Sequence, residues 1–398
     1  MSDPAGKLQI RIGAAGTSIG SSRPVRAASV FVGREPGETA RLLPALFSVC
    51  ATAQSVACVG ALEQAQGLMP MPTALALRQH LVAAETLREH LWRILLDWPR
   101  FLDLEPDARA MARAMDGHAR LRAALTAGAD AFEGGGVKRV PDSAAAQEAM
   151  ASLRDLVADR VLGLAPGQWL DAVPGLDALT SWCAETSTVA ARLMKRILDQ
   201  DLADLGRTVV GALPEGDVAL LSVRLDSRLS TVAADAFVAR PTWNGEPRET
   251  SVLTRSLTLP VIQDLVAHFG NGILTRLAAQ LLEVAQIASG TRYSTELGLA
   301  ERPQGVVESM DSRLGPGVGL AQVPAARGLL VHRVEVRDGR VADYRILAPT
   351  EWNFHPQGVV AAGLDAIASR VQGTELEPLA RLFVAAVDPC VDFDLIWT

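Results

Sequence analysis

The segment 328–347, GLLVHRVEVRDGRVADYRIL, constrains the fold more than any other part of the sequence. It consists of two runs of alternating apolar residues on either side of Asp338-Gly339. This dipeptide is a strong turn signal, and alternation on both sides of it is typical of an antiparallel β-hairpin. The chain must therefore contain a sheet, even though helical periodicity dominates the rest of the sequence.

The remaining pattern predicts a helix-dominated α+β protein with small peripheral antiparallel sheets. Two short strands are expected at 8–13 and 26–33, joined by the Gly/Ser-rich stretch 16–23, and a further strand is expected at 216–225. Helical periodicity covers eight segments, at about 37–67, 73–96, 105–128, 143–162, 176–205, 260–288, 357–370 and 376–386. Cys50 is expected inside the first of these helices.

Composition excludes several classes of protein. A formal net charge of −7 argues against general affinity for nucleic acid, which requires a basic face. Charged residues interrupt every apolar run well before a membrane-spanning length, so no membrane insertion is expected. The first residues, MSDPAGKLQIRIG, do not resemble a signal peptide. The expected location is the cytoplasm.

The four cysteines do not form a familiar framework. Cys50, Cys58, Cys183 and Cys390 contain no CxxC pair, so zinc spacing is absent, and four cysteines in a chain of this length are too few for a disulfide scaffold. Cys58 and Cys183 are predicted to be core residues. Cys50 and Cys390 lie beside apolar helices near opposite ends of the chain, which is compatible with ordinary packing or with a shared site.

Four segments together resemble the large subunit of nickel–iron hydrogenases: the N-terminal hairpin, FSVCATAQSVACVGALEQAQG, the Arg-Gly hairpin followed by PTEWN, and the final DPC. In that family the motifs RxCGxCxxxH and DPCxxCxxH supply four thiolates to nickel and iron. Cys50 matches the bridging cysteine of the first motif, and Phe47 stands where the nickel-only cysteine would be. Cys390 matches the first cysteine of the second motif, and Phe393 replaces the other. Since nickel in this family requires soft sulfur donors, the resemblance implies no nickel and no hydrogenase activity.

The surroundings of the iron atom are better preserved than the thiolates. In the family, an arginine and a Ser/Thr hydroxyl donate hydrogen bonds to the cyanide ligands of the iron. Arg327 and the pair Pro349-Thr350 match those positions, although Ala326 replaces a proline. Anionic cyanide needs such donors when it is buried. His355, in the segment WNFHP, is a candidate ligand or hydrogen-bond donor, or else a packing histidine before a proline.

A hydrogenase-like chain that has lost half of its thiolates resembles the HupK/HoxV-type accessory proteins. The resemblance implies one large-subunit-like unit over residues 1–398, with a first motif region at 8–67, a helical body at 68–290, and a hairpin plus C-terminal motif region at 322–398. It also implies a non-catalytic scaffold that transiently binds an Fe(CN)2CO unit. Cys50 would be the iron ligand and Cys390 a second thiolate.

The resemblance also implies partners. The unit would come from HypC–HypD-type maturation factors and pass to the precursor of a hydrogenase large subunit. Two alternatives remain open: an assembly chaperone that never binds metal, and a structural subunit of a hydrogenase-related membrane complex.

Overall fold

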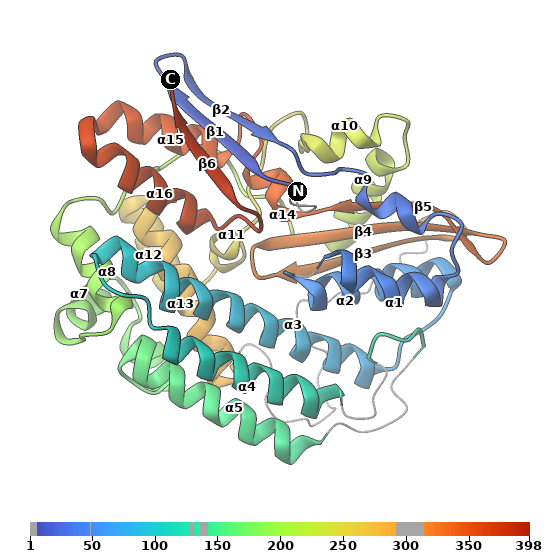
Figure 1. Ribbon diagram of the computed structural model, residues 1–398, viewed down its shortest axis with the longest axis horizontal. Coiled ribbons are helices and arrows are strands. Elements are labelled where there is room, and N and C mark those ends of the chain that lie inside the picture. The colour runs from blue at the N-terminus through green and yellow to red at the C-terminus, as the bar shows by residue number, and fades with distance from the viewer. Residues whose placement is uncertain (1–5, 48, 127–130, 136–141, 292–313) are drawn as a thin grey trace.

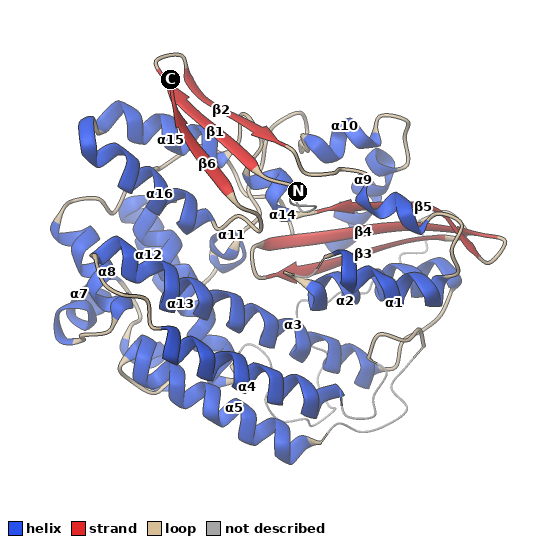
Figure 2. Ribbon diagram, in the orientation of Figure 1, coloured by secondary structure: helices blue, strands red, loops and turns tan. Residues whose placement is uncertain are grey.

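The computed structural model describes residues 6–47, 49–126, 131–135, 142–291 and 314–398. A helical body occupies one side of the molecule and two small sheets lie on the other (Figures 1 and 2). The helices are α1 (Pro36–Leu46), α2 (Ala51–Gln66), α3 (Pro72–Trp92), α4 (Ala108–Thr126), α5 (Ser143–Val157), α6 (Pro166–Ala172), α7 (Leu176–Glu185), α8 (Val189–Asp199), α9 (Val218–Leu229), α10 (Ala234–Ala239), α11 (Val252–Ser256), α12 (Pro260–Phe269), α13 (Ile273–Ser289), α14 (Pro349–Asn353), α15 (Val359–Arg370) and α16 (Leu376–Val387). The predicted helix-dominated α+β class is confirmed.

Six strands form two three-stranded sheets. The strands are β1 (Leu8–Gly13), β2 (Gly16–Ser21), β3 (Val318–Ala325), β4 (Gly328–Arg337), β5 (Arg340–Leu347) and β6 (Phe393–Trp397). One sheet has the order β3-β4-β5 and is wholly antiparallel. The other has the order β2-β1-β6, in which β6 runs parallel to β1. No helix in the described ranges is both long and apolar enough to cross a membrane.

The sheet β3-β4-β5 lies between two helical layers. Alternation along β3 sends Ala321 toward the cluster that contains residues of α2, and Leu320 toward the cluster that contains residues of α9 and α10. The predicted hairpin is confirmed, with Asp338 in the left-handed region at φ 50° and Gly339 at φ 71° at its turn.

Helix α2 packs unusually close to this sheet. Its sequence, ATAQSVACVGALEQAQ, is rich in small residues, and almost every one of them is buried. At the contact, β3 presents Gly319, where a Cβ atom would collide with the carbonyl oxygen of Ala61 and lie 2.7 Å from the amide nitrogen of Ala65. Glycine is therefore required here by the proximity of two backbones. Because Cys50 immediately precedes α2, this contact also fixes the position of Cys50.

The second sheet brings the two ends of the described chain together, as Figure 1 shows. Leu8 on β1 pairs with Phe393 on β6, and the next residues continue in parallel register to Ile12 and Trp397. The turn that precedes β6 therefore lies beside the segment that follows β2. This places Cys390 next to Arg23.

Several sequence predictions about local structure are wrong. The partner of β1 is Gly16–Ser21, which was expected to be a turn, and the expected strand at 26–33 contains the 3-10 helix Ala27–Phe31. The segment 216–225 begins helix α9 instead of forming a strand. There the side chain of Asp217 accepts a hydrogen bond from the amide of Leu220 and caps the helix.

The single helix expected over 37–67 is two helices, α1 and α2, separated by a break around Cys50. Cys50 is the residue that caps the N-terminus of α2, with φ −116° and ψ 43°. Strands β3 and β6 were not predicted at all. Part of the expected loop at 130–142 lies outside the described residues.

Candidate metal-carrier site

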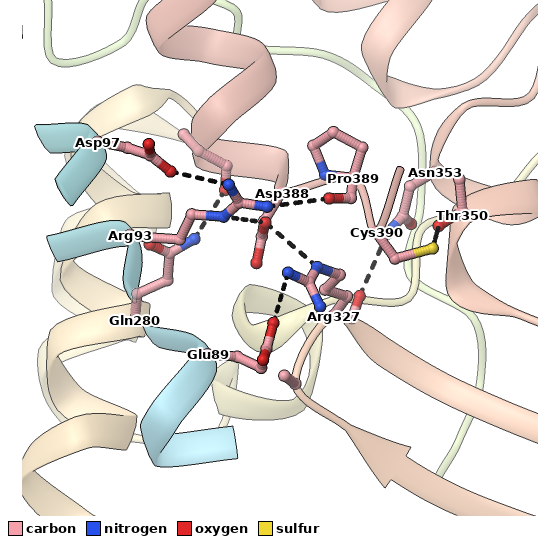
Figure 3. A network of polar contacts seen from close by, with 12 residues as sticks. Glu89, Arg93, Asp97, Gln280, Arg327, Thr350, Asn353, Asp388, Pro389 and Cys390 are labelled. Carbon is pink, nitrogen blue, oxygen red and sulfur yellow. Dashed lines mark hydrogen bonds and ion pairs between the residues drawn. The ribbon is translucent and has the colours of Figure 1, made fainter. Parts of the chain in front are cut away.

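Cys390 lies just beyond the end of α16, where the chain turns toward β6. Helix α16 ends when Asp388 adopts the left-handed conformation at φ 64°, which Asp tolerates better than most residues. The Cys390 sulfur lies 2.9 Å from the Thr350 hydroxyl, as seen in Figure 3, and accepts a hydrogen bond from Nη1 of Arg23 at 3.2 Å. Two polar groups from distant parts of the chain thus hold this thiol.

Arg327 occupies a buried cluster of charges beside Cys390 (Figure 3). Its Nη2 donates to Glu89 at 2.9 Å, and its Nε lies 3.3 Å from Asp388 Oδ1. Arg93 donates to the same Asp388 oxygen at 2.7 Å and to the carbonyl of Pro389 at 3.1 Å. Burial alone would lower the pKa of Arg327, but Asp388 and Glu89 more than offset it, so the pKa is raised and the side chain stays charged.

Cys50 is held by the N-terminus of α2 and its neighbours. The carboxylate of Glu85, on α3, accepts hydrogen bonds from the amides of Thr52 at 2.8 Å and Ala53 at 3.0 Å. Glu85 therefore satisfies the free amides at the start of α2. Burial, assisted by the charges of Cys390 and Glu85, raises the pKa of the Cys50 thiol to about 12. A metal that binds Cys50 must displace this proton.

A chain of neutral hydrogen bonds reaches Cys50 from within the protein. Gln54 Nε2 lies 3.7 Å from the Cys50 sulfur, and its Oε1 lies 2.8 Å from His332 Nε2. Since an amide oxygen only accepts, Nε2 of His332 carries the proton and Nδ1 accepts from the Tyr344 hydroxyl at 2.9 Å. Cys58 continues the chain with a hydrogen bond to Tyr344.

The buried imidazole predicts a specific dependence of stability on pH. Burial lowers the pKa of His332 from 6.5 to about 3. Between these two pH values His332 is protonated in the unfolded chain but neutral in the folded protein. The free energy of unfolding therefore falls as the pH drops from 6.5 toward 3. From His332 alone, the free energy of unfolding should be about 2 kcal/mol lower at about pH 5 than at neutral pH. Urea titrations at the two pH values measure this difference.

The matched variant is His332→Gln, which keeps a polar side chain that does not titrate. The difference in its free energy of unfolding between the two pH values should be smaller than that of the wild type by about 2 kcal/mol. His118, whose pKa burial lowers to about 4, contributes a similar slope and should continue to do so in the variant. An unchanged pH slope in His332→Gln would show that the folded protein accepts a proton at His332.

The two thiols share one environment. The charge of Cys390 raises the pKa of Cys50, Arg327 acts on both sulfurs, and Arg23 is influenced by both. Cys390 and Arg327 also line a cavity of about 1180 Å³, which runs past Arg93. Phe393, in the position of a lost thiolate, lines the same cavity. The two thiols therefore lie in one neighbourhood, and the cavity reaches Cys390.

The structure brings together four of the six predicted site residues: Cys50, Cys390, Arg327 and Thr350. Pro349 occupies the first turn of α14, where its ring suits the helix start, and so orients Thr350.

His355 makes a local contact instead. Its Nδ1 accepts a hydrogen bond from the amide of Gln357 at 3.1 Å. Burial lowers the pKa of His355, and the nearby charge of Arg240 adds to that effect. A role for His355 as a ligand stays a prediction. Its position beside Arg240 is separate from the contacts that surround Cys390.

Sequence reasoning missed several residues around the two thiols. Arg23 donates hydrogen bonds to both Glu351 and Cys390. Glu85, Glu89 and Gln54 lie on the helices around Cys50 and Arg327. The available signal was the substitution of Gln54 for a histidine of the first motif. Arg23 had no such signal, because it follows a Gly/Ser-rich segment without a motif.

The protein supplies an incomplete set of metal ligands. Among the residues that the structure describes, no three His, Cys, Asp or Glu side chains converge in a way that could hold a metal ion. Phe47 packs with the apolar cluster between α2 and the sheet, so it offers no donor. A metal bound by these two thiols would need further ligands from another source.

Comparison with known proteins identifies the fold and the family of this chain. Residues 262–391 match the nickel-dependent hydrogenase family. In fold, the chain is similar to the Ni-Fe-Se hydrogenase from D. vulgaris Hildenborough, with a TM-score of 0.61, 17% sequence identity, and coverage of 94% of this chain and 93% of that one. The expected hydrogenase-large-subunit-like fold is thereby confirmed.

Two curated relatives match almost the whole chain. One is the hydrogenase expression/formation protein HupK of Bradyrhizobium diazoefficiens, which is 31% identical over 92% of this chain and 88% of its own length. The other is the hydrogenase expression/formation protein HoxV of Cupriavidus necator, also 31% identical, over 98% of this chain and 94% of its own length. The chain therefore belongs to the HupK/HoxV family of hydrogenase expression/formation proteins.

Proposed function

We propose that this protein is a non-catalytic carrier in hydrogenase maturation, which binds an Fe(CN)2CO unit through Cys50 and Cys390 and then releases it. The unit would come from HypC–HypD-type maturation factors and pass to the precursor of the hydrogenase large subunit. The observation that carries the proposal is the meeting of two thiols from opposite chain ends beside Arg327 and Thr350.

The incomplete ligand set supports a cargo of this kind. An Fe(CN)2CO unit brings three ligands of its own, so that two thiolates complete most of its coordination. Arg327 lines the cavity next to Cys390 and remains charged, which suits a donor to anionic cyanide. The hydroxyl of Thr350, 2.9 Å from the Cys390 sulfur, is a second donor close to the same position.

Release is favoured by the proton affinity of Cys50. Because the pKa of the free thiol is about 12, protons compete with the metal for the sulfur at neutral pH. A carrier must hold its cargo less firmly than the final acceptor does. Two thiolates, one of them readily reprotonated, meet that requirement better than four.

Infrared spectroscopy of protein purified anoxically from cells that express the iron-maturation factors tests the proposal. Carbon monoxide and cyanide bound to iron absorb where proteins are nearly transparent. We expect such bands in the wild type and their loss in Cys50→Ala. The matched control is Cys183→Ala, which removes a buried thiol in α7 and should leave the bands unchanged.

Absence of the bands from the wild type, with binding of the maturation factors intact, would contradict the carrier and favour a metal-free assembly chaperone. Retention of the bands in Cys50→Ala would show that Cys50 is not a required ligand.

A further inference from the structure

Arg23 forms a bridge between a sulfur atom and a carboxylate at the Cys390 side of the site. Its Nε donates to Glu351 Oε1 at 2.7 Å, and its Nη1 donates to the Cys390 sulfur at 3.2 Å. The side chains of Arg23 and Glu351 are only 18% and 11% exposed. A single guanidinium therefore holds together a sulfur and a carboxylate that come from different segments.

We propose that Arg23 is a built-in cation that takes the place of a metal between Cys390 and Glu351, and so excludes nickel and other divalent cations from this side of the site. This inference rests on the proposed carrier function and specifies how such a carrier would remain selective for its iron unit.

The donors around Arg23 are those that a divalent metal would use. A thiolate and a carboxylate both bind transition-metal ions, and a soft sulfur ligand particularly suits nickel. The second carboxylate oxygen of Glu351 is buried and has no hydrogen-bond partner among the described residues. Without Arg23, the site would offer a sulfur and two carboxylate oxygens.

Arg23 keeps its positive charge, because its guanidinium does not lose a proton to a competing metal. A guanidinium carries five donors and no acceptor, and it does not lose its proton in proteins. Burial alone would lower the pKa of Arg23, but Glu351 and Cys390 more than offset this effect and raise it. A permanent positive charge within hydrogen-bonding distance of the sulfur repels a bare divalent cation, whereas an Fe(CN)2CO unit with ferrous iron carries no net charge.

The fold holds Arg23 in this position. Residue 23 directly follows the hairpin of β1 and β2, and its amide donates to the side chain of Ser21 at 3.2 Å. Strand β6, which begins three residues after Cys390, pairs with β1 of the same hairpin. The same sheet therefore sets both ends of the contact between Arg23 and Cys390.

Metal binding by the protein purified without iron tests this inference. The affinity for Ni²⁺ is measured by calorimetry, and sulfur coordination is monitored with Co²⁺ through its thiolate-to-metal absorption. The wild type should bind neither ion at Cys390. We expect Arg23→Gln to bind both ions through Cys390, with an affinity at least about tenfold above any residual affinity of the wild type, because a like charge has been removed next to the donors.

Three further variants identify the cause. Arg23→Lys keeps the positive charge and should continue to exclude the metals. Adding Cys390→Ala to Arg23→Gln should abolish the gained binding and the cobalt–thiolate absorption. Arg26→Gln, in the same segment but 63% exposed and paired with Asp235, is the matched control and should behave as the wild type does.

The inference is overturned if the wild type already binds nickel through Cys390, or if Arg23→Lys gains as much affinity as Arg23→Gln. Circular dichroism verifies that each variant is folded. Should Arg23→Gln unfold, Arg23→Met keeps an unbranched side chain without the charge, leaves both metal donors in place, and should bind cobalt through sulfur more tightly than the wild type. These measurements need no iron unit. The metal-exclusion inference can therefore fail while the infrared experiment supports the carrier, and the carrier can fail while metal exclusion by Arg23 is supported.

Discussion

Replacing Arg327 with methionine should lower the free energy of unfolding by about 3–5 kcal/mol, the usual cost of removing one partner from a buried ion pair. Arg327 is 7% exposed and neutralises Asp388, which is 4% exposed. Glu89 would lose one of its two arginine partners and keep Arg88. Arg93 remains near Asp388, but it is already shared with Asp97.

The stability of the variant should also depend less on pH below neutrality. In the wild type, burial would raise the pKa of Asp388, but Arg327 and Arg93 outweigh burial and lower it below 3.8. The stability from this pairing is present above pH 3.8 and is lost as the pH falls through the lowered pKa. Without Arg327 the pKa of Asp388 lies closer to 3.8, so less of this stability is present at neutral pH and less is lost as the pH falls.

Chemical denaturation at several pH values measures both effects. The control is Arg196→Met, which breaks an exposed pair with Asp103 at 3.9 Å and should cost no more than about 1 kcal/mol. Equal losses in the two variants would contradict the importance of the buried cluster.

Replacing Gly319 with alanine should cost about 3 kcal/mol or more, at the upper end of what overpacking costs. The added methyl group would meet backbone atoms of Ala61 and Ala65, which cannot rotate away as a side chain could. Helix α2 must then shift from the sheet, and Cys50 must move with it. We therefore expect lower stability together with loss of the infrared bands from bound iron.

Gly37→Ala is the matched control for that substitution. Gly37 lies in the first turn of α1, and a Cβ there would have nothing within 4 Å. The change should be neutral or stabilising by up to about 1 kcal/mol. Urea unfolding distinguishes the two glycines. A neutral Gly319→Ala would mean that α2 can move without cost.

The sequence predicted those elements whose signals are local. The hairpin at 328–347 contains its own turn and its own alternation of apolar residues. Helix α15 begins shortly after Pro356, and α16 ends just before Asp388-Pro389. The expected strand at 216–225 failed because the cap at Asp217 outweighed a short apolar pattern. Strand β2, GTSIGS, has an exposed and polar pattern, so only its pairing with β1 identifies it.

The same distinction applies to the site. Cys50, Cys390, Arg327 and Thr350 could be found because they lie in short motifs that resemble a known family. Arg23 could not, because its role depends on a contact across 367 positions of sequence. Long-range pairing of charges leaves no periodic trace in a single sequence.

The parallel pairing of β6 with β1 also determines when the site can form during synthesis. Leu8 is synthesised 385 residues before its partner Phe393. Contacts between such distant segments form late and slowly. Cys50 is therefore made long before Cys390, and the proposed cargo, which requires both sulfurs, could be loaded only after the segment around Cys390 has been synthesised.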